Sequence, residues 1–191
     1  MNADEVLNLL KECHAMVWAT RDRMANTKWT APNTADSLRF AVTEAGEALK
    51  AQFLTMATIK ATEAMDAMLR EVGGFARNDN DKQHSVNAEL ADCAMMLLTA
   101  MGETFSIPPS YLKFPRTGLE EIIWCVSIAA YSFAATNCDT GIAWSNRGLI
   151  EILRYPDLDL RTELSARLER IERKHGQPWN KAKVVTGECH Q

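Results

Sequence analysis

Residues 86–102 read VNAELADCAMMLLTAMG, a stretch in which Glu89 and Asp92 are the only charged residues. The spacing of the remaining side chains predicts a helix that is apolar around most of its circumference, and such a helix is normally buried. Glu89 and Asp92 are three residues apart, so they lie on one face, about a turn from each other. Because two buried carboxylates are costly unless a partner offsets their desolvation, the stretch predicts a bound cation.

A second acidic pair lies upstream, in SLRFAVTEAGEALKAQFL at residues 37–54. Glu44 and Glu47 are again three residues apart, with Gly46 between them to permit a close approach. They lie on the side opposite an apolar stripe, which consists of Leu38, Ala41, Val42, Ala45, Leu49 and Phe53. Antiparallel packing of this helix against residues 86–102 would bring four carboxylates together.

The donor types indicate which metal such a site would take. Ligation by carboxylate oxygens alone suits Mg²⁺ or Mn²⁺. Neither acidic pair contains the histidine that a di-iron bundle requires. The five cysteines are widely spread and form no CxxC motif, which argues against structural zinc and favours reduced thiols in the cytoplasm.

The rest of the chain also reads as helix, so we predict an all-α fold. No segment alternates convincingly between polar and apolar residues. We expect Asn33, Thr34 or Asp36 to cap the second helix and Ser85 to cap the third. The predicted helices are residues 4–25, 37 to the mid-fifties with a helical pattern continuing to about 72, 86–103, 117–136, 141–154 and 157–175. A polar loop at 75–85, a Pro-rich connector at 106–116 and a loose tail after 175 complete the chain.

Composition and net charge favour some classes of protein and disfavour others. The chain has 191 residues, 47% hydrophobic and 24% charged, with a formal net charge of −4. These values are typical of a folded globular protein and disfavour binding to a nucleic acid polymer. Acidic residues near the N-terminus argue against a secretory signal, and residues 122–135 are too few to span a membrane. We therefore expect a cytoplasmic protein.

The order EAGE (residues 44–47) and then ELAD (residues 89–92) resembles the all-α nucleoside triphosphate pyrophosphohydrolases, the MazG-like and dCTP pyrophosphatase group. The mark of this family is ExxE on one helix and ExxD on the next. The similarity extends from about residue 20 to 116, including WTAPNTADSLRFAV before the first pair. It implies a core at 1–116 with a long insertion around 55–85, and leaves 117–191 as a C-terminal helical extension.

The resemblance implies that the enzyme hydrolyses a ribo- or deoxynucleoside triphosphate to the monophosphate and pyrophosphate, with Mg²⁺, or Mn²⁺ as the alternative, for its cofactor. Glu44, Glu47, Glu89 and Asp92 would be its metal ligands and catalytic residues. Glu44 or Glu47 would be the general base, with nothing in the sequence to choose between them.

Several other residues are candidates for substrate binding. Trp29 either stacks on the base or anchors its loop to the helices, and Lys50 either contacts phosphate or pairs with Glu47. Among the cations in the flanking loops, we expect at least one to reach the polyphosphate: Arg77, Lys82, Lys113 or Arg116. The alternative function is a non-catalytic helical protein that binds nucleotides or regulates a partner. In either case the buried helices suggest a homodimer or homotetramer.

Overall fold

A computed structural model describes residues 2–25, 27, 33–54, 85–102, 105–107 and 118–176. The described residues form six helices and no strand, so the all-α prediction is confirmed. The helices are α1 (Ala3–Met24), α2 (Thr34–Leu54), α4 (Val86–Ala100), α5 (Leu119–Ala134), α6 (Cys138–Leu153) and α7 (Leu160–His175). The continued helical pattern to residue 72, the loop at 75–84 and the tail after 176 lie outside the described residues.

Side-chain caps explain where the helices begin. Asn33 accepts a hydrogen bond from the backbone N–H of Asp36, at 2.9 Å, and Ser85 accepts one from Ala88, so both predicted caps are confirmed. Asn137 caps α6, which therefore begins three residues earlier than the pattern predicted. Asp159 caps α7, which begins three residues later than predicted.

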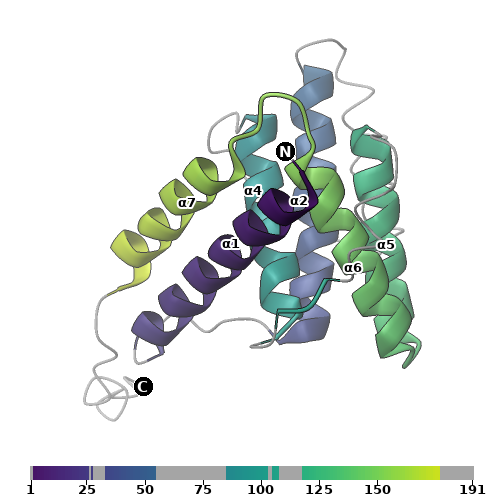
Figure 1. Cartoon of the computed structure of the whole chain (residues 1–191), viewed down its shortest axis with the longest axis horizontal. Helices are drawn as coiled ribbons and strands as arrows, with labels where there is room; N and C mark the ends of the chain where they lie inside the picture. The colour runs from purple at the N-terminus through teal and green to yellow at the C-terminus, as the bar shows by residue number, and fades with distance from the viewer. Residues whose placement is uncertain are drawn as a thin grey trace, which may run out of the picture.

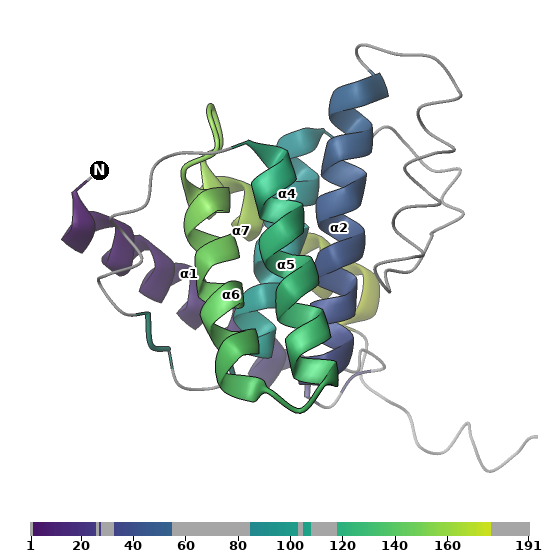
Figure 2. The ribbon, with the colours of Figure 1, turned by 90° about the vertical axis from the view of Figure 1, so that its right-hand side faces the viewer.

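α2 and α4 lie side by side and antiparallel in the centre of the molecule (Figure 1). α5 packs against α2 and α6, and α6 also packs against α4, so these four helices surround a common core (Figure 2). α1 and α7 pack against each other and against α4. α4 is consequently covered by four other helices, α1, α2, α6 and α7, and this accounts for its apolar circumference.

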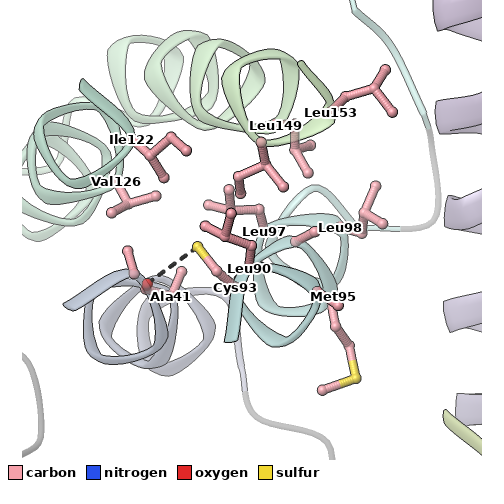
Figure 3. Packing of buried hydrophobic residues seen from close by; sticks show 14 of the residues in the cluster. Ala41, Leu90, Cys93, Met95, Leu97, Leu98, Ile122, Val126, Leu149 and Leu153 are labelled. Carbon is pink, nitrogen blue, oxygen red and sulfur yellow. Dashed lines mark hydrogen bonds between the residues drawn. The ribbon is translucent and has the colours of Figure 1, made fainter. Parts of the chain in front are cut away.

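The core lies between α4 and its neighbours. Leu90 and Leu97 of α4, Val126 of α5 and Leu149 of α6 are fully buried and point toward one another (Figure 3). Each such side chain contributes about 1.5–3 kcal/mol by leaving water. At Gly148 of α6, an added Cβ would be in ordinary van der Waals contact with Leu97 and Val126 side-chain atoms at 3.4 Å, so α6 packs directly on α4 and α5 at this point.

The C-terminal end of α4 is tied to α1. Gly102, which follows the helix, adopts a φ of +77°, a left-handed conformation that favours glycine. The Nε2 of His14 on α1 lies 2.8 Å from the carbonyl oxygen of Gly102 and is placed to donate a hydrogen bond to it. None of the described helices combines the length and hydrophobicity needed to cross a membrane.

Candidate metal centre

α2 supplies two of the candidate ligands. Glu44 is only 2% exposed and Glu47 is half-buried. Ala48, which lies one turn after Glu44, is buried as well, so the acidic side of α2 faces the protein rather than solvent. The sequence pattern indicated this, because Phe40, Ala51 and Leu54 share the acidic side.

α4 supplies the third candidate ligand. Glu89, which lies in the first turn of α4, is 2% exposed. One carboxylate oxygen each from Glu44, Glu47 and Glu89 lie within 4.8 Å of one another. The structure therefore brings together three of the four predicted ligands, across the interface between α2 and α4.

The register of α2 and α4 explains why these three carboxylates lie close together. The Sγ of Cys93 on α4 donates a hydrogen bond to the carbonyl oxygen of Ala41 on α2, at 3.3 Å (Figure 3). Glu89 lies one turn before Cys93, and Glu44 lies one turn after Ala41. Antiparallel helices in this register bring Glu89 to the level of Glu44 and Glu47, as the sequence predicted.

The pKa of the Cys93 thiol depends on its burial and on the negative charge beside it. Burial raises the pKa of the Cys93 thiol well above its ordinary value, and the negative charge of Glu44 raises that pKa further. Cys93 is therefore a protonated hydrogen-bond donor rather than a thiolate ligand. The oxygen-only donor set that the sequence predicted is consistent with this protonation state.

Asp92, the fourth predicted ligand, contacts α7 instead. The Nε of Arg167 donates a hydrogen bond to Oδ1 of Asp92, at 2.8 Å, and Nη2 of Arg167 contacts Oδ2. The two side chains are only 10% and 15% exposed. Asp92 is not part of the group formed by Glu44, Glu47 and Glu89.

Sequence reasoning did not single out Arg167. α7 carries so many charged residues that it read as a mostly solvated helix. A signal was nevertheless present, because Leu160, Leu164 and Leu168 recur every four residues and are all buried. Arg167 lies next to this apolar stripe in the helical pattern, so the sequence puts its side chain beside the surface that packs against neighbouring helices.

The other predicted site residues are placed only in part. Lys50 lies on α2 three residues after Glu47 and is half-buried, and its two alternative roles stay predictions. Five candidates for substrate binding lie outside the described residues, so their roles stay predictions: Trp29, Arg77, Lys82, Lys113 and Arg116.

The three glutamates fit a small divalent cation. Mg²⁺ binds carboxylate oxygens at about 2.1 Å, so two oxygens on opposite sides of one ion lie about 4.2 Å apart. Adjacent ligand oxygens of an octahedral ion lie closer, about 3.0 Å apart. The oxygens of Glu44, Glu47 and Glu89 lie within 4.8 Å of one another, so rotations of these side chains that bring the oxygens closer together would let them share one ion. Hard carboxylate donors suit Mg²⁺ and Mn²⁺ better than softer metals.

Comparison with protein-family models, with curated proteins and with solved structures finds no match for this chain. Membership of the all-α pyrophosphohydrolases, which the acidic motifs and the stretch around them predict, therefore stays a prediction.

Proposed function

We propose that this protein is a Mg²⁺- or Mn²⁺-dependent nucleoside triphosphate pyrophosphohydrolase, which converts a ribo- or deoxynucleoside triphosphate to the monophosphate and pyrophosphate. The observation that supports this most is the meeting of Glu44, Glu47 and Glu89 across two antiparallel, largely buried helices. The order of the ExxE and ExxD motifs supports it independently.

The chemistry requires charge neutralisation and positioning more than covalent help from the protein. A divalent cation bound by the three glutamates would neutralise phosphate charge and acidify a bound water. The water oxygen would form a bond to the α-phosphorus while the bond from that phosphorus to the oxygen bridging the α- and β-phosphates breaks, and pyrophosphate would leave with the bridging oxygen. Glu44 or Glu47 accepts the proton of the water, and the half-buried Glu47 has the better access to solvent for releasing it.

Two further parts of the proposal come from the sequence. Widely spread cysteines without a CxxC motif favour a reducing compartment such as the cytoplasm, and the many buried helices favour a homodimer or homotetramer.

A second candidate function is a non-catalytic protein that binds or senses nucleotides. The ion pair between Asp92 and Arg167 favours it, because the acid that the ExxD motif supplies is neutralised by α7. Both candidate functions predict cation binding, and only the first predicts turnover.

The test is an incubation of the purified chain with ribo- and deoxynucleoside di- and triphosphates, with and without Mg²⁺, followed by mass analysis of the products. We expect metal-dependent release of a monophosphate and pyrophosphate from a triphosphate. Glu44→Gln and Glu89→Gln should abolish it, and Glu120→Gln, which changes an exposed glutamate on α5, should not. Full activity in either of the first two variants would contradict the site, and binding without turnover would favour the non-catalytic alternative.

A further inference from the structure

The ion pair between Asp92 and Arg167 joins the acidic helix α4 to α7, a helix of the C-terminal extension. Both oxygens of Asp92 contact the guanidinium, one at Nε and the other at Nη2. Paired contacts of this kind between arginine and a carboxylate are among the stronger hydrogen-bonded arrangements in proteins, especially where water is largely excluded. Asp92 is therefore held toward α7.

Asp92 also lies three residues after Glu89, on the same side of α4, so it borders the group formed by Glu44, Glu47 and Glu89. The two contacts occupy the lone pairs of Asp92 that face Arg167, and the positive charge of the guanidinium next to them disfavours binding of a cation to the same carboxylate. Arg167 and a divalent cation consequently compete for Asp92.

The guanidinium of Arg167 is also suited to bind a phosphate group in place of Asp92. The fork of donors that matches a carboxylate also matches two oxygens of a phosphate group. A polyphosphate next to the glutamates would lie beside Arg167, since Asp92 and Glu89 are separated by about one turn of α4.

We propose that Arg167 couples nucleotide binding to cation binding: it holds Asp92 away from Glu44, Glu47 and Glu89 until the phosphate groups of a nucleotide engage its guanidinium and release Asp92 as a fourth cation ligand. This inference rests on the proposed function and assigns a positioning role to a residue of the C-terminal extension. Because the coupling is reciprocal, the nucleotide tightens cation binding and the cation tightens nucleotide binding.

The proposal predicts opposite changes in two affinities when Arg167 is removed. In Arg167→Leu, Asp92 becomes available without a nucleotide, so the affinity for Mn²⁺ alone should rise about tenfold, a size typical of coupled sites. The affinity for a non-hydrolysable α,β-methylene triphosphate in saturating Mn²⁺ should fall, because the phosphate contact is lost. A purely structural role for Arg167 would lower both affinities.

The experiment measures Mn²⁺ binding by electron paramagnetic resonance of the free ion and analogue binding by calorimetry. The double variant Arg167→Leu/Asp92→Asn should lose the gain in Mn²⁺ affinity. Arg170→Leu removes an exposed positive charge from the same helix and should leave both affinities unchanged. Arg167→Lys retains the charge and packing with a single contact, so it should show a smaller shift in the same direction if the leucine variant does not fold.

Because Asp92 and Arg167 are only 10% and 15% exposed, salt screens their charges weakly, so the double variant rather than ionic strength tests whether Asp92 is the new ligand. A gain in Mn²⁺ affinity that Arg167→Leu/Asp92→Asn retains, or an unchanged Mn²⁺ affinity in Arg167→Leu, would overturn the proposal. Wild-type binding of Mn²⁺ that Glu44→Gln does not weaken would instead overturn the proposed function.

Discussion

The thiol of Cys93 donates a hydrogen bond to the backbone carbonyl of Ala41, and this contact lies one helical turn from the glutamates that form the candidate metal centre. Both residues are fully buried. Small side chains at this point allow α2 and α4 to approach closely, and the close approach brings carboxylates of the two helices together. The geometry of the site therefore depends on the packing beside it.

Ala41→Leu should disturb the site without touching a ligand. Adding a larger side chain to a packed core costs about 1–3 kcal/mol, and here it would push α2 away from α4. We expect a lower free energy of unfolding and weaker Mn²⁺ binding, measured by urea denaturation and by titration. Ala134→Leu, at an exposed position on α5, is the matched control and should change neither. Unaltered Mn²⁺ binding in a destabilised Ala41→Leu would show that the register does not control the site.

The cysteines should differ sharply in reactivity. Burial, and to a smaller extent the negative charges of Glu12 and Glu121 respectively, raise the pKa of Cys13 to about 11 and that of Cys125 to about 12. At about pH 8, a thiol with a pKa of 11 is roughly one-thousandth ionised, and the thiolate is the reactive form. In the native protein we expect iodoacetamide to modify the exposed Cys138 and to spare Cys13, Cys93 and Cys125.

Mass spectrometry of the alkylated peptides distinguishes these positions, and alkylation after urea unfolding provides the control in which all of them react. Modification of native Cys93 as fast as Cys138 would mean that the interface between α2 and α4 opens readily.

Removal of divalent cations should lower thermal stability if the three glutamates bind an ion. Free Mg²⁺ at 100 times its dissociation constant stabilises the folded state by about 2.7 kcal/mol. For a chain of this size, that corresponds to a rise in Tm of about 5–10 °C. We expect a chelator to reverse this rise in the wild type and to have little effect on Glu47→Gln. The same response in both proteins, measured by calorimetry, would mean that the cation acts elsewhere.

The sequence predicted the helices and the pairing of Glu44 and Glu47 with Glu89, because helical periodicity and helix order are properties of the chain itself. It did not predict the partner of Asp92, since Arg167 is 75 positions away and the surrounding helix is highly charged. Nor did it show which side of α5 faces solvent. Residues 122–134 carry no charge, yet Trp124 is 64% and Tyr131 is 76% exposed. The partner of a buried side chain and the side of a helix that faces solvent depend on tertiary packing, which the pattern of a single helix does not determine.

Asp159 should stabilise α7, and with it Arg167, in a pH-dependent way. Its carboxylate accepts hydrogen bonds from the hydroxyl of Thr162, at 2.8 Å, and from the backbone N–H of Thr162, at 3.2 Å. The hydrogen bond from the hydroxyl, and to a smaller extent the one from the backbone N–H, lower the pKa of Asp159 below its ordinary value. Loss of an N-cap costs about 1 kcal/mol, so Asp159→Ala should lower the free energy of unfolding by about this amount at neutral pH.

The sign of the pH dependence follows from the lowered pKa. The stabilisation is fully present above the unfolded-state pKa of about 4 and is lost as the pH falls through the lower pKa of the folded state. The difference between wild type and Asp159→Ala, measured by urea denaturation, should therefore be constant from pH 7 to about pH 4 and narrow below it. Asp159→Asn retains a cap without an ionisable group, so its difference from Asp159→Ala should not change with pH. A wild-type advantage that grows on acidification would contradict the charged cap.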